Sequence, residues 1–229
     1  MKISVIIPTF NEENTIIELL KRVKKQSDEG SNLEVIVVDD CSTDNSKKLL
    51  TENPDLYNKL ILLNKNVGKG GAVREGLLNA TGEYILFQDA DLEYNPKDYK
   101  QIFNIIHEYK ADVIIGSRFL SPKYTRVHYF YHKVGNKIIT FLFNILYNTT
   151  FTDIYSCYLS FKRELIQPNN LKSNSWSQQA EILATAVKSS SIYYEVPISY
   201  SGRTFEDGKK IKARHTLSVV WMIIKKRLF

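Results

Sequence analysis

The sequence predicts an α/β protein built on a mainly parallel sheet that is flanked by helices. Short β-branched and apolar runs alternate with segments in which apolar residues recur at helical spacing. Several of these runs end at a proline or a carboxylate, as at Pro8 and Asp89. Such an alternation gives parallel sheets covered on both faces, and these sheets bind ligands beyond the carboxyl ends of their strands. We therefore expect Pro8, Asp40, Asp89, Asp91 and Arg118 to converge at one edge.

The first half of the chain supplies the expected parallel strands and the helices between them. The first strand, residues 3–7, is β-branched and ends at Pro8, and Asn11 is expected to cap the helix that follows. The other expected strands are residues 33–38, 60–63, 84–87 and 113–116. Further helices are expected after the cap residues 42–44, after the glycine-containing segment 66–71, and from Pro96 to about residue 109.

The pattern changes after residue 120. Residues 123–148 are basic, aromatic and apolar without an acid, which indicates one or two amphipathic helices, with an ordinary core-facing pair as the alternative. Residues 153–161 resemble a strand, residues 176–188 a helix, and residues 192–200 a strand that contains Pro197. A charged loop, residues 201–214, then leads to a C-terminal helix that carries Trp221.

Bulk composition excludes several classes of protein. Of the 229 residues, 43% are hydrophobic and 24% are charged, which is a globular rather than a disordered composition. Cys41 and Cys157 give no metal spacing and no disulfide framework, so we expect reduced thiols in a cytoplasmic protein. No secretory signal is expected at the start. The longest apolar run, residues 138–147, would span only about 15 Å as a helix, too little to cross a bilayer.

The net charge of +6 is concentrated towards the C-terminus. From Gly202 onward there are eight Lys or Arg residues and two acids, so the rest of the chain is neutral in total. A basic stretch can bind nucleic acid, a phosphorylated substrate or an anionic membrane surface, or it can be a solvated face. Because interleaved exposed aromatic residues and a known nucleic-acid motif are missing, we expect no nucleic-acid partner.

Two carboxylates follow the expected strand at residues 84–87. Asp89 and Asp91 lie at positions i and i+2, so their side chains leave an extended chain on the same side. They repel each other unless a cation lies between them, and Mg²⁺ typically uses one or two carboxylates together with substrate phosphates. The spacing therefore points to a metal that holds a diphosphate, with a solvated acidic turn as the alternative.

A family resemblance rests on motifs that occur in order along the chain. In the first half they are residues 6–12 (IIPTFNE), 37–44 (VVDDCSTD), 66–70 (NVGKG), 88–93 (QDADLE) and 116–119 (GSRF). With this order and spacing the chain resembles the family-two inverting glycosyltransferases of GT-A fold. Residues 152–158 (TDIYSCY), 196–198 (VPI) and 202–211 (GRTFEDGKKI) are similar to the dolichol-phosphate mannosyltransferase branch and its bacterial polyprenyl-phosphate relatives. The resemblance covers essentially the whole chain.

The resemblance implies a single glycosyltransferase domain over residues 1–229. Residues 1–120 would bind the nucleotide sugar and the metal, and residues 121–229 would form the acceptor half, with amphipathic helices and the basic loop. The nucleoside would be held by Pro8, Phe10, Glu12, Val38 and Asp40. The sugar diphosphate would be held by Asp89, Ala90 and Asp91 through Mg²⁺ or Mn²⁺, with Glu93 as a further metal ligand. Donor or acceptor phosphates would be bound by Arg118, Arg126, Arg203 and Lys209, and the catalytic residues would be Asp91, Arg118 and Arg203.

The reaction implied by the resemblance moves a hexose from a GDP- or UDP-sugar to a polyprenyl or dolichyl phosphate, with inversion in one displacement. A lipid phosphate is already an anionic nucleophile, whereas the alternative acceptor, a saccharide hydroxyl in cell-surface polysaccharide synthesis, needs a general base. Asp153 and Glu181 are the candidates for that base. With a lipid acceptor we expect peripheral attachment at the cytoplasmic face of a membrane, and the sequence leaves open whether a separate membrane protein anchors the chain.

The sequence departs from the family pattern at three places. Glu93 stands where a glutamine is common, and residues 178–181 (QQAE) are more polar than the aromatic-rich version of this segment. Arg214 and His215 replace the usual residues after the basic loop. The contacts of these segments are therefore left open by the resemblance.

Overall fold

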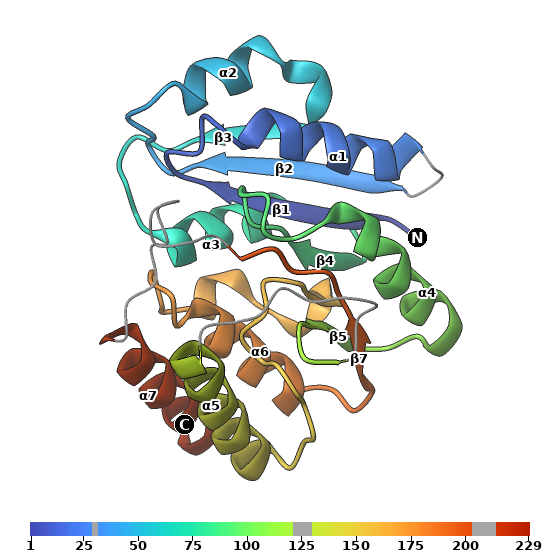
Figure 1. Cartoon of the computed structure of the whole chain (residues 1–229), viewed down its shortest axis with the longest axis vertical. Coiled ribbons are helices and arrows are strands. Elements are labelled where there is room, and N and C mark those ends of the chain that lie inside the picture. The colour runs from blue at the N-terminus through green and yellow to red at the C-terminus, as the bar shows by residue number, and fades with distance from the viewer. Residues whose placement is uncertain (29–31, 121–129, 203–213) are drawn as a thin grey trace.

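The structure, a computed structural model, describes residues 1–28, 32–120, 130–202 and 214–229. Within these ranges the strands form one seven-stranded sheet in the order β3-β2-β1-β4-β6-β5-β7 (Figure 1). The strands are β1 Ile3–Thr9, β2 Leu33–Asp39, β3 Lys59–Leu62, β4 Tyr84–Phe87, β5 Val113–Ser117, β6 Leu159–Lys162 and β7 Tyr193–Pro197. Neighbouring strands are parallel except at β6, which runs antiparallel to β4 and β5. The prediction of a mainly parallel sheet is confirmed.

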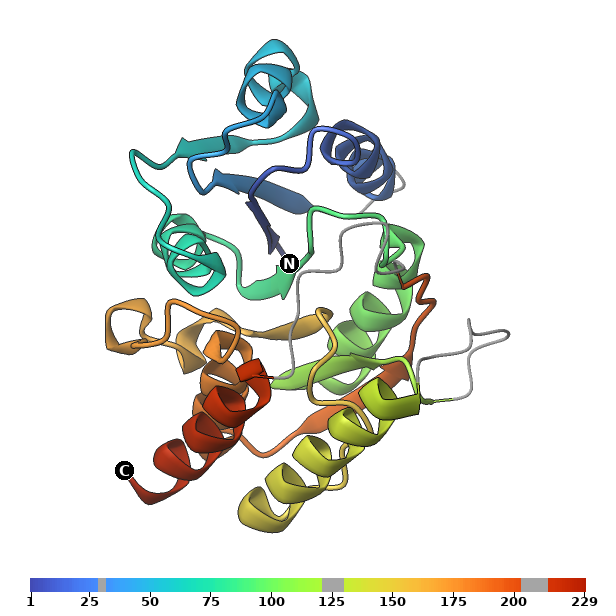
Figure 2. The same cartoon turned by 60° about the vertical axis from the view of Figure 1, so that its left-hand side comes forward.

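Helices cover both faces of the sheet. The described helices are α1 Ile16–Asp28, α2 Ser46–Glu52, α3 Lys69–Asn79, α4 Tyr99–Tyr109, α5 Phe130–Tyr147, α6 Gln178–Lys188 and α7 Arg214–Leu228. In Figure 2, α1 and α4 are seen on one side of the sheet and α3 and α6 on the other. The inner strands are buried between these layers, and each residue of β4 and β5 is buried, whereas the edge strand β3 has no buried residue. This burial explains why these strands read as continuous apolar runs.

The start of α1 differs from the sequence prediction. The helix begins at Ile16 and not directly after Asn11. Asn11 has a left-handed backbone with φ of 54°, and its side-chain oxygen accepts a 2.8 Å hydrogen bond from the Thr43 amide. Asn11 therefore joins the turn after β1 to the turn after β2 instead of capping a helix.

The strand expected over residues 153–161 is shorter in the structure. Only its last part belongs to β6, and the residues before Leu159 form an irregular loop. The amides of Thr152 and Asp153 donate to the Glu195 carboxylate of β7, at 2.8 and 3.2 Å. These backbone groups are satisfied by a side chain, so they do not need a partner strand.

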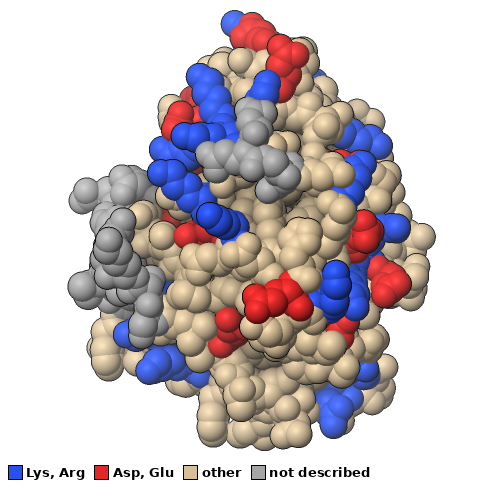
Figure 3. Space-filling view, turned by 90° about the vertical axis from the view of Figure 1, so that its right-hand side faces the viewer, with Lys and Arg blue, Asp and Glu red and all other residues tan. Residues whose placement is uncertain are grey.

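The predicted amphipathic stretch contains one described helix, α5, and residues 121–129 before it lie outside the described residues. α5 and α7 pack together, and the Tyr147 hydroxyl of α5 donates to the Ile223 carbonyl of α7 at 3.0 Å. Among the described helices, none combines the length and the apolar character needed to span a membrane. On the face drawn in Figure 3, basic and acidic side chains are both present with broad uncharged areas between them.

Candidate functional site

A cavity of about 430 Å³ lies at the carboxyl ends of β1, β2 and β4. The structure brings eight of the residues predicted from the sequence to this cavity: Pro8, Phe10, Glu12, Asp40, Asp89, Ala90, Asp91 and Glu93. The convergence expected from the strand ends follows from the parallel register, which places Pro8 opposite Val38 and Ile6 opposite Phe87. The main cavity, as we call it below, is thus built from loops that leave three adjacent strands.

One end of the main cavity suits a flat, polar ring. Phe10 leaves β1 there with 37% of its surface exposed, which is high for an aromatic side chain beside a buried strand. The Thr15 hydroxyl donates to the Ala90 carbonyl at 3.0 Å, so the turn after β1 is fixed to the segment after β4. An exposed phenyl ring held in this way offers a surface on which an aromatic base can stack.

Asp40 lies beside this ring and organises the loop before α3. Its Oδ1 accepts the Val67 amide at 2.7 Å and its Oδ2 accepts the Gly68 amide at 2.9 Å. Burial raises the pKa of Asp40 above its ordinary value, against the effect of these two hydrogen bonds. Each carboxylate oxygen has a further lone pair, so Asp40 can still accept a hydrogen bond from a ligand. Gly68 is required here because its backbone has φ of 82°.

The main cavity is also lined by the two predicted acidic residues, Asp89 and Asp91. The Lys69 ammonium lies 2.5 Å from Oδ1 of Asp89, and Asp91 accepts the Glu93 amide at 3.1 Å. Burial lowers the pKa of Lys69 more than any other single effect, but Asp89 and the other nearby anionic groups together raise it further, so the net pKa lies above the ordinary value. Lys69 is therefore a stable cation beside the carboxylates, in a position to contact an anionic ligand.

The acidic end has the chemistry of a site for a hard divalent cation, with a ligand set that the protein alone does not complete. In the described residues, no group of three or more His, Cys, Asp or Glu side chains is placed to hold a metal ion. Glu93, the third predicted ligand, accepts a 2.9 Å hydrogen bond from the Tyr200 hydroxyl. Asp89 and Asp91 both line the cavity, and one or two carboxylates plus phosphate oxygens form a usual Mg²⁺ environment. The residues present therefore fit a metal whose coordination is finished by a bound diphosphate.

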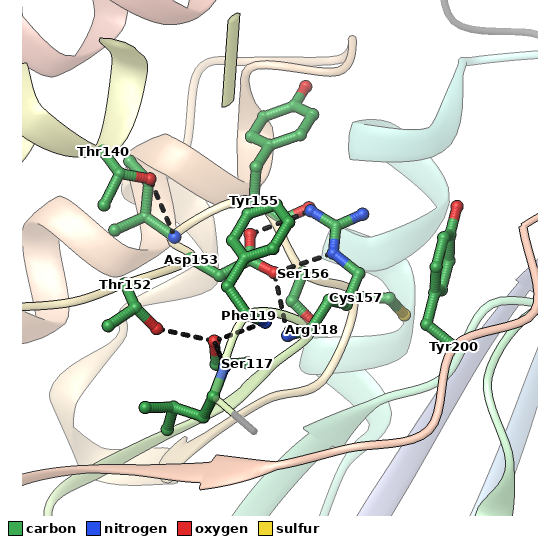
Figure 4. A network of polar contacts seen from close by, with 12 residues as sticks. Ser117, Arg118, Phe119, Thr140, Thr152, Asp153, Tyr155, Ser156, Cys157 and Tyr200 are labelled. Atoms are coloured by element: carbon green, nitrogen blue, oxygen red, sulfur yellow. Dashed lines mark hydrogen bonds and ion pairs between the residues drawn. The ribbon is translucent and has the colours of Figure 1, made fainter. Parts of the chain in front are cut away.

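Arg118, at the end of β5, forms a nearly buried ion pair with Asp153 (Figure 4). Its Nε and Nη2 lie 2.7 and 2.8 Å from the two oxygens of Asp153, and its backbone amide donates to the same carboxylate at 3.1 Å. The guanidinium lies 5.1 Å from the Tyr200 ring centre and 5.7 Å from that of Phe119. Burial lowers the pKa of Arg118, but Asp153 raises it well above the ordinary value. Arg118 is thus a fixed charge, oriented by Asp153.

A smaller cavity of about 70 Å³ adjoins the main one. The two cavities share Lys69, Asp89, Glu93, Trp176 and Tyr200 in their linings. The smaller one is closed by Arg118, by Tyr155 and Cys157 of the loop before β6, and by the first residues of α6. Burial raises the pKa of the Cys157 thiol well above its ordinary value, so it lines the wall as a neutral group.

Some predicted residues lie away from the cavities or outside the described structure. Val38 is fully buried in β2, opposite Pro8 and Ile61, so it supports the sheet and lines neither cavity. The structure does not bring Val38 to either cavity, and its assignment to the nucleoside stays a prediction. Three predicted phosphate-binding residues lie outside the described residues: Arg126, Arg203 and Lys209.

The two candidate general bases are structural in this fold. Asp153 is fully buried against Arg118, as described above. Glu181 is also fully buried, and it accepts the amides of Lys172 and Ser173 while Lys226 of α7 lies 3.0 Å away. Neither carboxylate lines the main or the smaller cavity. Both charges hold segments of the second half of the chain in place.

Sequence reasoning missed several residues of the site. Lys69 was part of a recognised motif but had no role, and Trp176 and Tyr200 were counted only as parts of a helix and a strand. The Lys69 ammonium lies 5.2 Å from the Trp176 ring centre, and both residues line the two cavities. Trp176 reaches the cavities because residues 173–174 lie close to the start of α3. The Gly70 amide donates to the Asn174 carbonyl at 3.1 Å. Two adjacent glycines after Lys69 were the available signal for this approach.

Several solved structures share the fold of this chain. Glucosyl-3-phosphoglycerate synthase from Mycobacterium tuberculosis, in complex with phosphoglyceric acid, is 16% identical at a TM-score of 0.74, with 100% of this chain and 80% of that chain covered. The same synthase with Mn²⁺, UDP and glucosyl-3-phosphoglycerate is 15% identical at 0.74, with the same shares covered. S. aureus TarS 1-349 with UDP-GlcNAc is 21% identical at 0.65, with 99% of this chain and 66% of that chain covered.

These identities are low, so the structural likeness establishes the fold. The family is established by the sequence itself. A family model described as Glycosyl transferase family 2 matches residues 4–168, which is well over half of the chain and includes every residue of β1 to β6 after Ile3. The chain therefore belongs to glycosyl transferase family 2.

Proposed function

We propose that this family-two glycosyltransferase transfers a hexose from a nucleotide sugar to a polyprenyl or dolichyl phosphate, with Mg²⁺ or Mn²⁺ at the diphosphate. The observation that carries the proposal is the main cavity, which is lined by the ring of Phe10 and the carboxylate of Asp40 together with Asp89, Asp91 and Lys69. This arrangement matches a ligand that has an aromatic base at one end and a diphosphate at the other.

The donor is bound from the base to the sugar along this cavity. Phe10 stacks on the base, and Asp40 accepts a hydrogen bond from its ring N–H, a group that uracil and guanine both offer. A UDP donor is favoured because the Mycobacterium tuberculosis synthase structure contains UDP with Mn²⁺ and the TarS structure contains UDP-GlcNAc. GDP-sugars stay in the assay below because Asp40 does not distinguish the two bases.

Charge at the acidic end favours departure of the nucleoside diphosphate. A divalent cation bound by Asp89 and Asp91 would offset the negative charge that grows on the leaving phosphate. Lys69 adds a fixed positive charge on the same side, because its ammonium is held by Asp89. Arg118, held by Asp153, places a second fixed positive charge at the smaller cavity.

The fate of the two candidate bases supports a phosphate acceptor. A hydroxyl acceptor must lose a proton to a base within hydrogen-bond reach, whereas a lipid phosphate needs only positioning and charge screening. Asp153 and Glu181 are both occupied by buried ion pairs and line neither cavity. Arg118 is a cation that suits a phosphate, and it lines the smaller cavity.

Exposed apolar side chains on α5 and α7 support peripheral attachment to a membrane. Those of α5 are Phe130, Tyr131, Val134, Ile138, Phe141 and Ile145, and those at α7 are Leu217, Trp221, Leu228 and Phe229. Neither helix contains an Asp or Glu, and exposed cations lie among the apolar residues at Lys133, Lys137, Lys225 and Arg227. Apolar and cationic groups on one helix pair suit an anionic bilayer surface, where a polyprenyl phosphate is found.

The proposal is tested by incubating the full chain with radiolabelled UDP- and GDP-sugars, Mn²⁺ and undecaprenyl phosphate. We expect label in the organic phase with one donor, and a loss of at least about 100-fold with Asp91→Asn, which removes a charge at the diphosphate. Saccharide acceptors are run in parallel. Label only on a saccharide would replace the lipid acceptor by the alternative one, and no transfer from any donor would overturn the proposed function.

A further inference from the structure

The smaller cavity contains a buried acceptor that no group in the described part of the chain satisfies. Gln178, the first residue of α6, is 4% exposed and lines this cavity. Its Oε1 has no hydrogen-bond partner among the described residues. A buried acceptor without a donor carries a desolvation cost, and such groups in native proteins call for an explanation, of which a bound ligand is one.

Three of the surrounding donors are engaged with other partners. The Tyr155 hydroxyl donates to the Trp176 carbonyl at 2.8 Å, and the Tyr200 hydroxyl donates to Glu93 at 2.9 Å. The neighbouring amide, Nε2 of Gln179, donates to the Ser156 carbonyl. Gln178 therefore differs from these three groups in having a buried acceptor atom without a partner in a residue that lines the smaller cavity.

The size of the cavity limits what can enter. Its volume of about 70 Å³ is roughly twice the share of one water molecule in the liquid, about 30 Å³. A pyranose ring does not fit, but a single hydroxyl or hydroxymethyl group does. The shared lining of Lys69, Asp89 and Trp176 places this space directly beside the end of the main cavity that suits the diphosphate.

We propose that the smaller cavity receives a hydroxyl-bearing substituent of the transferred hexose and that Oε1 of Gln178 accepts the hydrogen bond from that hydroxyl. The inference rests on the proposed function and adds a specificity-determining residue to it. The sugar ring lies at the junction of the two cavities, with its anomeric carbon towards the diphosphate. A donor that lacks this hydroxyl leaves Gln178 without its partner, so the enzyme selects against the deoxy sugar.

The direct test is calorimetric binding with Mn²⁺ present, which needs no acceptor. Wild type and Gln178→Leu are titrated with UDP, GDP and a panel of donors: UDP-glucose, UDP-galactose, UDP-N-acetylglucosamine and GDP-mannose. We expect Gln178→Leu to weaken the cognate nucleotide sugar by about 10-fold or more while its affinity for the matching nucleotide stays unchanged. The result that overturns the inference is an unchanged ratio of sugar-nucleotide to nucleotide affinity for every donor.

Two controls separate ligand binding from a structural role. Gln26→Leu changes another buried glutamine, on α1, that lines neither cavity, and it should leave the ratio of the two affinities as in wild type. Gln178→Leu should unfold at a temperature no lower than wild type, because it removes an acceptor that is unsatisfied in the free protein. A clear drop in unfolding temperature with an unchanged affinity ratio would show a structural glutamine and overturn the inference.

A deoxy-sugar series identifies the hydroxyl. With wild type, one monodeoxy analogue of the cognate donor should bind about 10-fold or more weakly than its parent, and Gln178→Leu should bind the two equally. Equal binding of all analogues by wild type would overturn the inference while leaving the proposed function in place. Failure of every nucleotide and nucleotide sugar to bind would overturn the proposed function, and the inference with it.

Discussion

Replacing Asp153 by asparagine should destabilise the protein strongly without changing how its activity depends on pH. Asp153 is fully buried and accepts three N–H groups of Arg118, whose side chain is 11% exposed. Asparagine has one acceptor oxygen and turns its amide donors towards the guanidinium. The variant would thus lose at least one charge-assisted hydrogen bond and leave Arg118 as an uncompensated, nearly buried cation.

The expected loss in the free energy of unfolding is about 3–5 kcal/mol, the range for breaking a buried ion pair on one side. This is a large share of the roughly 5–15 kcal/mol by which domains are stable. Urea unfolding at pH 7, followed by circular dichroism, measures it. A matched control is Glu18→Gln, which breaks the exposed pair with Arg22 and should cost no more than about 0.5 kcal/mol.

The same variant decides between two roles for Asp153. If this carboxylate only orients Arg118, the acidic limb of the pH–rate profile stays where it is in wild type. If Asp153→Asn removes the acidic limb and lowers kcat by several orders of magnitude, Asp153 is a general base. If the variant lowers the free energy of unfolding by less than about 1 kcal/mol, the ion pair is solvated. Either result would refute the reasoning from burial.

Three further substitutions test other parts of the structure. Gly70→Ala brings a Cβ against the backbone carbonyl of Ser173, so urea titrations should show a loss of about 1–3 kcal/mol, and an unchanged midpoint would contradict this close approach. Burial alone would raise the pKa of Glu34, but hydrogen bonds from Lys2 and its neighbours lower it to about 2. Because the folded-state pKa of Glu34 is lowered, its carboxylate stabilises the fold fully above the unfolded pKa near 4.5, and this stabilisation is lost as the pH falls towards 2. Glu34→Gln should therefore lower the free energy of unfolding by about 1–2 kcal/mol at pH 7 and by progressively less in acid. A loss that does not depend on pH would contradict this assignment. Phe141→Glu should weaken binding to anionic vesicles by about 10-fold or more in sedimentation assays, and unchanged binding would exclude this part of α5 from the membrane surface.

Much of the site could be predicted because strand ends in a parallel sheet lie at one edge. The positions of Pro8, Asp40 and Asp89 follow from the register of three adjacent strands, and all three line the main cavity. The same reasoning does not resolve neighbours within a strand. Val38 lies two residues before Asp40, yet it is buried in the core because β2 is covered on both faces.

The contacts in the second half of the chain could not be predicted because they join distant segments. Arg118 and Asp153 are 35 residues apart, and the pair exists only because the loop before β6 crosses the end of β5. Glu181 pairs with Lys226 of the last helix in the same way. A carboxylate read from a sequence can equally be a base or a buried counter-ion, and only its burial and partners distinguish the two.

The central claim is that a cation held by Asp89 and Asp91 takes up the charge of the leaving nucleotide. Single-turnover transfer from the cognate donor, measured for wild type and Asp91→Asn with Mn²⁺ or with EDTA, tests it most directly. We predict that EDTA slows wild type by at least about 100-fold, that Asp91→Asn is slowed to a similar extent, and that EDTA adds little to the variant. Equal rates for wild type with Mn²⁺ and with EDTA would contradict the account.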